Sequence, residues 1–255
     1  MALGIFTHPT GAFAQLDPND PWPKYGQNIR NTYRSPFRGP HTVPELRWWA
    51  PAGFGNGCSG VPGDYRSGAA IARVSGVRYI FVPGNDCIDN TPRDPKVQIF
   101  RFHPCGAGGG FPATAATPIA AIDLTQPDPL AGEIVLSTPL ILKRMIGSEL
   151  TTLLIIQTTM RVRCYTLELP AECGGPVPVE LRWTYPSSGA FETTDQLEAS
   201  SPTVSNPMRD GSGADYLIVQ ANRLNEDEIS TTYLHRLQVD AADPGATAVR
   251  FPIRT

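Results

Sequence analysis

Short apolar runs separated by polar turns recur along most of the chain, and three groups of these runs line up. Each group opens with a strand-like run of small residues that begins with serine. The three runs are Ser67–Arg73, Ser137–Lys143 and Ser200–Asn206. The interval between them is about 65 residues, and a fixed interval of this size predicts a repeated structural unit.

Two further runs follow the opening run in every group. The second is rich in β-branched or aromatic residues, and its continuous apolar character predicts a strand buried on both faces. These runs are Arg78–Gly84, Leu150–Thr159 and Asp215–Asn222. The third alternates between apolar and polar residues, which predicts a half-buried strand. These runs are Val97–His103, Val162–Leu169 and Thr232–Val239.

A fourth run closes each group after a loop rich in Gly, Pro and Ala. These runs are Pro118–Leu124, Val179–Pro186 and Thr247–Ile253. Four short antiparallel strands, small at the inner edge and aromatic at the outer edge, are typical of a propeller blade. We therefore predict an all-β fold, a partial β-propeller with blades at approximately 53–130, 131–190 and 191–255. The alternative is a β-sandwich with a chance run of strands.

The N-terminal part of the chain differs from these units. Residues 1–21 are expected to be a tail or the remnant of an export signal, and residues 22–52 a polar leader followed by one strand. That strand, ELRWWAP (Glu45–Pro51), nearly repeats ELRWTYP (Glu180–Pro186) of a predicted fourth strand. We predict that it is a closing strand, delivered across the rim to finish a blade begun elsewhere.

Composition agrees with a β-rich globular protein and excludes two classes of partner. The 26 Pro and 24 Gly indicate many turns, and 41% of the residues are hydrophobic. A net charge of −3 leaves no basic footprint for a nucleic acid. The longest apolar run, Leu150–Gln157, is too short to cross a bilayer, so no transmembrane segment is expected.

The N-terminal residues suggest that the protein is exported. The stretch GAFAQ (Gly11–Gln15) resembles the small-residue end of a secretory signal, with cleavage after Ala14. The alternative is a disordered tail. Five cysteines agree with an oxidising compartment, and none has the spacing of a zinc, thioredoxin or haem motif. We expect a periplasmic or extracellular location.

The cysteines allow two disulfides. Cys58 precedes the first inner strand and Cys87 follows the second, so antiparallel pairing places both at one edge of the blade. A bridge there would contribute roughly 3–4 kcal/mol on the chain-entropy estimate. Cys105 and Cys173 occupy matching places after third strands and are a second candidate pair. Cys164 lies within a strand and is expected to be a small buried hydrophobe.

Two acidic segments offer candidate binding groups. The loop Gly84–Pro95 holds oxygen ligands of the kind that calcium prefers, although such loops also form simple turns. Its candidate ligands are Asp86, Asp89, Asn90 and Asp94. The corresponding loop two units later carries Glu226, Asp227 and Glu228. These three residues make either a solvated loop or a rim that attracts a basic partner.

Histidine and tryptophan are expected to have structural roles. His8 and His41 lie in irregular segments, whereas His103 and His235 lie on third strands, where surface or hydrogen-bonded core roles are expected. No G-x-S-x-G elbow is present, and no residue is predicted to be catalytic. Tryptophans at outermost strands and in the leader are expected to pack blades together or anchor the leader. They are Trp22, Trp48, Trp49 and Trp183.

Several segments together resemble the quinoprotein-type, or PQQ-like, β-propellers. They are W-P-x-Y-G-x-N-x-x-N-T-x-R-S in the leader, P-E-L-R-W, and repeats of the form S-P-x-V, Y-L-I-V and T-x-x-L-x-R-L-x-V-D-A. The resemblance covers Trp22 to Thr255. That family includes quinoprotein dehydrogenases and non-enzymatic relatives such as the outer-membrane assembly lipoprotein. It implies a closed ring of about seven or eight blades.

The chain departs from the dehydrogenases of that family. Only remnants of the tryptophan-docking motif A-x-D-x-x-T-G-K-x-x-W are present, around Asp123 and Asp240, and no adjacent Cys–Cys pair exists. No residue is therefore expected to carry quinone chemistry, and no cofactor is expected. The alternative is the N-terminal portion of a dehydrogenase that binds pyrroloquinoline quinone (PQQ) and Ca²⁺ through residues elsewhere.

Three blades alone make an arc, and an arc exposes an apolar face at each end. A second polypeptide, self-association, or the remainder of a longer protein would each cover these faces. We favour a protein partner. The expected function is thus a non-catalytic, exported subunit for protein binding or assembly.

Overall fold

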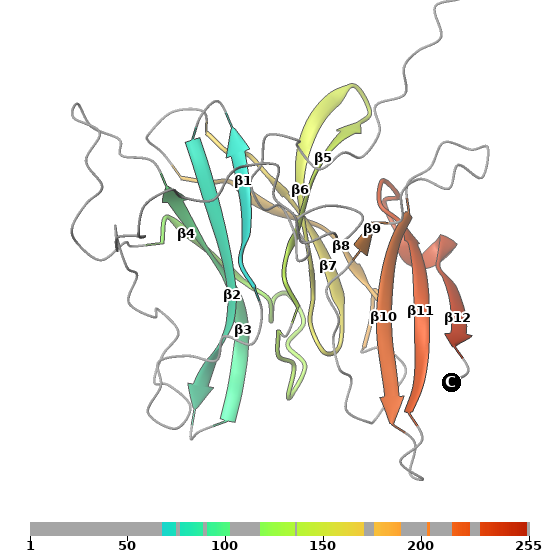
Figure 1. Ribbon diagram of the computed structural model, residues 1–255. Helices are drawn as coiled ribbons and strands as arrows, with labels where there is room; N and C mark the ends of the chain where they lie inside the picture. The colour runs from blue at the N-terminus through green and yellow to red at the C-terminus, as the bar shows by residue number, and fades with distance from the viewer. Residues whose placement is uncertain are drawn as a thin grey trace, which may run out of the picture.

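The computed structural model describes residues 68–74, 77–88, 91–102, 118–135, 137–170, 176–189, 203–204, 216–224 and 230–253. These residues form three four-stranded sheets and one short 3₁₀ helix (Figure 1). Neighbouring strands in every sheet are antiparallel. The predicted all-β class is confirmed. The tail, the leader and the closing strand lie outside the described residues.

Each sheet is a meander in which consecutive strands pair. The first sheet contains β1 (Ala70–Val74), β2 (Val77–Ile88), β3 (Thr91–Phe102) and β4 (Ala120–Asp123). The second contains β5 (Leu140–Ile146), β6 (Glu149–Gln157), β7 (Val162–Leu167) and β8 (Val179–Tyr185). The third contains β9 (Thr203–Val204), β10 (Tyr216–Leu224), β11 (Ser230–Gln238) and β12 (Val249–Ile253), with helix η2 (Pro244–Thr247) before β12. The three predicted four-strand groups are therefore real structural units.

In each unit, the third residue after the serine that opens the group pairs with a residue of the second strand, and we align the three units on these pairs. These pairs are Ala70 with Phe81, Leu140 with Ile155, and Thr203 with Ile218. Equivalent positions can therefore be assigned from one sheet to the next by counting along paired strands.

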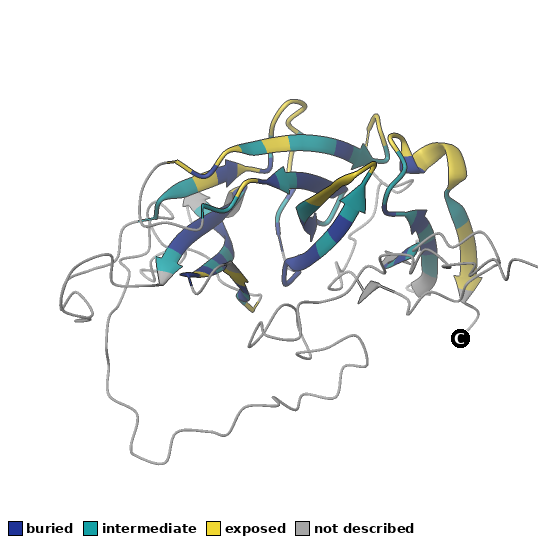
Figure 2. Cartoon of the chain, turned by 90° about the horizontal axis from the view of Figure 1, so that it is seen from above, coloured by how far each residue is buried: buried dark blue, intermediate teal, exposed yellow. Residues whose placement is uncertain are grey.

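Two apolar clusters join the sheets into a stack, and the second sheet contributes to both. Leu154 and Ile156 of β6 point to the cluster shared with the first sheet, while Leu153 and Ile155 point to the cluster shared with the third. Successive side chains of a strand alternate between its faces, so the second sheet is buried on both sides. Seen from above, the buried residues gather where sheets face each other (Figure 2).

Burial on both faces is confirmed for Leu153–Gln157 of β6, but it is wrong for Tyr79–Val82 of β2 and Tyr216–Val219 of β10, where buried and half-buried residues alternate. In β2, Tyr79 and Phe81 are fully buried while Ile80 is half-buried. In β10, Leu217 is fully buried while Ile218 is half-buried. The reason is position in the stack, because the first and third sheets each face one described neighbour and β6 faces two.

Among the described residues no helix has the length and apolar character needed to span a bilayer.

Candidate functional site

The contact of β8 with the third sheet shows how one sheet is fastened to the next. Trp183 Nε1 donates a hydrogen bond to the carbonyl oxygen of Val239 at 3.3 Å, and Arg182 donates to the carbonyl oxygen of Asp240 at 3.0 Å. The hydroxyl of Tyr185 lies 3.0 Å from Nδ1 of His235. Arg182, Trp183 and Tyr185 all belong to the segment ELRWTYP. We call this set of contacts the latch.

The side chain of Asp240 adds an ion pair to the latch. Its carboxylate lies 3.6 Å from the guanidinium of Arg144 on β5. Asp123 has a local role instead, because its carboxylate accepts hydrogen bonds from the backbone and hydroxyl of Thr125. The aspartates in the two remnants of the tryptophan-docking motif therefore have structural contacts, Asp123 within a turn and Asp240 with Arg144.

The latch tests two expectations about individual side chains. Trp183 is 5% exposed and packs between sheets, as predicted, and His235 is a hydrogen-bonded core residue, as predicted. Trp48, Trp49, Trp22, His8, His41 and His103 lie outside the described residues.

Replacing Trp183 with phenylalanine should destabilise the fold by about 1–2 kcal/mol, because the carbonyl of Val239 loses its donor while most apolar contact remains. Thr184, its half-buried neighbour on β8, provides the control. Thr184→Val should change the free energy of unfolding by less than about 0.5 kcal/mol in urea titrations. Equal effects of the two changes would contradict the latch.

The outer face of the third sheet is the clearest candidate for a contact surface. Directly paired residues of neighbouring strands point to the same side of a sheet. On the outer face of the third sheet, Ile218 lies opposite Arg236, Arg236 opposite Val249, and Leu234 opposite Phe251. We define the end face as these five residues together with Tyr216. Phe251 is 47% exposed, and the other members are half-buried.

Equivalent positions in the other sheets are fully covered. Tyr216 and Ile218 correspond by register to Leu153 and Ile155 in the second sheet and to Tyr79 and Phe81 in the first. Those four residues have no solvent exposure, because each lies against the following sheet. The end face thus has the side-chain pattern of a sheet-to-sheet interface without a following sheet among the described residues.

Arg236 gives the end face a polar feature. Its guanidinium carbon lies 4.5 Å from the centroid of the Tyr216 ring, a distance at which the cation is attracted to the ring face. Its Nε is buried and has no hydrogen-bond partner in the described part of the chain.

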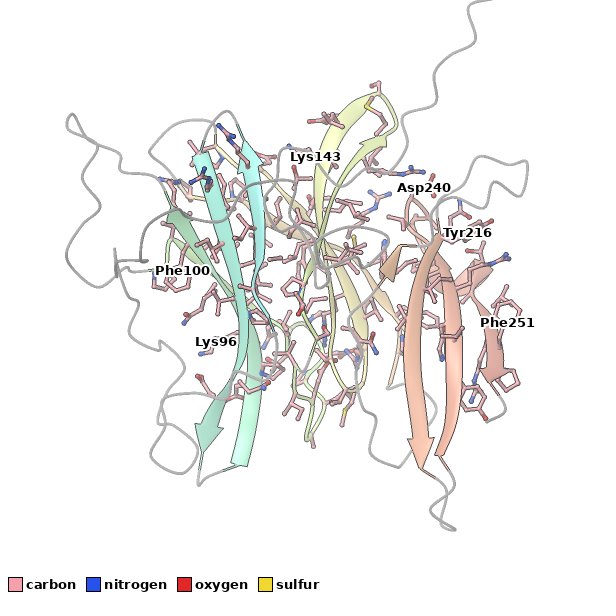
Figure 3. The ribbon with its side chains drawn as sticks, viewed as in Figure 1. Lys96, Phe100, Lys143, Tyr216, Asp240 and Phe251 are labelled. Atoms are coloured by element: carbon pink, nitrogen blue, oxygen red, sulfur yellow. The ribbon has the colours of Figure 1, made fainter. Side chains whose placement is uncertain are left out.

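The opposite end of the stack differs at some positions. Ile80, opposite Phe100, lies on the outer face of the first sheet, which we call the front face. Phe100 is only 3% exposed and Gln98 only 4%. Figure 3 shows Phe100 and Phe251 at opposite flanks of the stack. Phe100 is therefore buried on the front face, where Ile80 is half-buried, whereas Phe251 is exposed on the end face.

A buried ion pair lies between the first and second sheets. The Arg163 guanidinium on β7 contacts both carboxylate oxygens of Glu133, at 2.5 and 3.1 Å. The Thr158 hydroxyl donates to the same carboxylate at 2.5 Å. Arg163 and the side chain of Glu133 are fully buried, so water cannot replace either partner. This arrangement is structural, because the charge is neutralised internally.

An amide clamp lies beside the ion pair. The Asn85 side chain of β2 donates to the carbonyl oxygen of Val135 at 3.0 Å and accepts from its N–H at 2.7 Å. Sequence reasoning missed both features. The available signal was an arginine and an asparagine within otherwise apolar strands, which implies buried partners.

The predicted calcium loop is mostly strand. β2 continues to Ile88 and β3 begins at Thr91, with a bulge at Asn85 and Asp86. The loop expectation was therefore wrong, because the hairpin extends. Asp86 pairs with Lys96 at 2.5 Å, and Asp94 is exposed.

The other two proposed calcium ligands, Asp89 and Asn90, lie outside the described residues. Within the described ranges, no three His, Cys, Asp or Glu side chains cluster to hold a metal. The calcium site stays a prediction.

The cysteine expectations are tested at one position. Cys164 is fully buried on β7, and burial raises the pKa of its thiol despite the opposing effect of Arg182. A protonated, buried thiol confirms the role of a small hydrophobe. Burial also raises the pKa of the neighbouring Tyr165 hydroxyl.

The remaining candidate residues are not tested. Cys87 lies on β2 opposite Pro92, while Cys58, Cys105 and Cys173 lie outside the described residues, so both disulfides stay predictions. The acidic rim of Glu226, Asp227 and Glu228 also lies outside them. Comparison of the chain with protein-family models, with curated proteins and with solved structures finds no match.

Proposed function

We propose that the chain is a non-catalytic scaffold subunit that binds a protein partner through the end face. The partial coverage of Tyr216 and Ile218, at positions fully buried in the other two sheets, carries this proposal. The proposal includes a propeller-like arc as the architecture and a location outside the cytoplasm. The three stacked four-stranded sheets support the arc.

The partner surface is proposed to be another four-stranded sheet, carried by a second polypeptide. Two successive interfaces in this chain already use the same positions of a sheet to contact the next one. A third interface of the same kind would continue the stack without a new geometry. It would remove Phe251 from water and place a backbone carbonyl near Arg236, as Arg182 and Trp183 meet carbonyls in the latch.

Phe251→Glu should disrupt association, because a carboxylate would then have to be buried in an apolar contact. The purified chain is expected to be multimeric or aggregation-prone by light scattering, since its uncovered end face has no partner. The variant should shift it toward monomer by about tenfold or more in dissociation constant. In the native host, the variant should also lose a co-purifying partner.

Leu150→Glu is the matched control. Leu150 is 63% exposed in the β5–β6 hairpin and lies away from the end face. This change should leave association unaltered. A wild-type chain that is a stable monomer and recovers no partner would overturn the proposal. If the chain associates only with a second copy of itself, self-assembly would replace the proposed partner protein.

A further inference from the structure

Aromatic side chains tie each described sheet to the next in the same direction. Between the first and second sheets, the Tyr79 hydroxyl of β2 donates to the carbonyl oxygen of Pro170. Between the second and third sheets, Trp183 Nε1 of β8 donates to the carbonyl oxygen of Val239. Pro170 follows β7 and Val239 follows β11, which are the third strands of their sheets. In both interfaces, an aromatic donor of one sheet therefore binds the main chain just after the third strand of the following sheet.

Tyr216 of the end face occupies the register position of Tyr79. Each tyrosine lies two residues before the second-strand residue on which the units are aligned. The sequences around them agree as well, because the pattern Tyr-x-x-Val-x-x-Asn occurs at 79–85 and again at 216–222. The second sheet has Leu153 at this position, so the first and third sheets share a feature that the second lacks.

An arginine of the same sheet lies over each of these tyrosine rings. The guanidinium carbon of Arg101 lies 5.8 Å from the centroid of Tyr79, and that of Arg236 lies 4.5 Å from the centroid of Tyr216. At both distances the cation is attracted to the ring face. The two rings differ in coverage, since Tyr79 has no solvent exposure and Tyr216 is half-buried. Tyr216 thus has the position and the arginine of an interface tyrosine without the full coverage.

We propose that Tyr216 is a partner-binding residue whose hydroxyl donates to a main-chain carbonyl oxygen of the docked sheet, in the segment directly after that sheet's third strand. This inference rests on the proposed function, and it adds the atom that is recognised and the orientation of the partner. The partner's sheet lies against the end face as the second sheet lies against the first, so that the stack keeps one direction. A tyrosine hydroxyl that becomes buried needs such an acceptor.

Tyr79→Phe calibrates the contact inside the chain. The ring stays and only the hydroxyl is lost, so the equilibrium constant for folding should fall by about two- to tenfold, the effect of one hydrogen bond. Urea titration of the full chain provides the measurement. An unchanged folding equilibrium would show that the contact of Tyr79 contributes nothing, and the proposal for Tyr216 would lose its precedent and be overturned.

Tyr216→Phe tests the proposal in the full chain. The probe is the protein that the wild-type chain retains from its native host, purified and titrated against each variant by biolayer interferometry. The dissociation constant should rise by about three- to tenfold, because one interface hydrogen bond is lost while the ring remains.

Tyr233→Phe is the matched control. Tyr233 also belongs to the third sheet, and the guanidinium carbon of Arg250 lies 3.7 Å from the centroid of its ring. Its neighbour Leu234 belongs to the end face, and adjacent residues of a strand point to opposite faces. Tyr233 therefore faces away from the partner, and its variant should change the dissociation constant by less than about twofold.

Benzoylphenylalanine in place of Tyr216 tests the orientation of the partner. It should crosslink to the segment that follows the third strand of the partner's sheet, and crosslinks confined to other parts of the partner would overturn the proposal. Binding of Tyr216→Phe as tight as that of the wild type, while Phe251→Glu disrupts association, would also overturn it and leave the proposed function intact. If Phe251→Glu has no effect, or if the wild-type chain retains no partner, the proposed function and this inference both fail.

Discussion

Replacing Glu133 with alanine should lower the free energy of unfolding by about 3–5 kcal/mol, because a fully buried arginine is left without its counter-ion. Arg163 has no solvent exposure, and its guanidinium donates to both carboxylate oxygens of Glu133, at 2.5 and 3.1 Å. The loss should be measured by guanidinium denaturation followed by circular dichroism.

Two variants check that the effect belongs to the buried charge. Glu149 is exposed at the start of β6, and Glu149→Ala should cost less than about 0.5 kcal/mol. Combining Glu133→Gln with Arg163→Met removes both charges, and it should recover part of the stability lost in Glu133→Ala. A cost below about 1 kcal/mol for Glu133→Ala would show that the pair is not desolvated as the structure indicates.

Truncating Leu154 or Ile155 to alanine should each destabilise the protein by about 2–5 kcal/mol. The two residues are neighbours on β6 but belong to different clusters, one facing the first sheet and the other facing the third. Large losses at both positions are expected only for a strand covered on both faces. Urea denaturation of the two single variants provides the measurement.

Ile218→Ala is the informative comparison, because Ile218 occupies the position of Ile155 in the third sheet. It is half-buried on the end face, so its truncation should cost clearly less, about 1 kcal/mol. A loss as large as that of Ile155→Ala in the monomeric chain would mean that the end face is already covered, which would contradict the proposed docking surface.

The strands and their grouping were predictable from the sequence because local pattern decides them. Apolar runs of strand length separated by Gly and Pro turns define each element, and recurrence of the run order defines the unit. The predicted runs 137–143, 162–169 and 179–186 correspond to β5, β7 and β8 with small differences at the ends. The prediction was poorest at Gly84–Pro95, where turn-forming residues suggested a loop and cross-strand pairing extends the hairpin.

The second strands of the three units have similar apolar patterns, but their side chains differ in burial, and only the stacking of the sheets decides that difference. Tyr79, Leu153 and Tyr216 occupy equivalent places, but their burial depends on whether another sheet lies against them. Likewise, the latch joins residues fifty or more positions apart in the chain, and the Glu133–Arg163 pair joins a loop to a strand. No local window contains both partners.

The amino-acid sequence by itself determined an all-β chain with three repeated four-strand units, because each strand's pattern records its own periodicity. Only the tertiary structure decided which faces are buried, which polar residues are neutralised and which apolar face stays partly open. Those properties depend on neighbours brought together across the stack, and burial is a property of the pair of surfaces rather than of either strand alone.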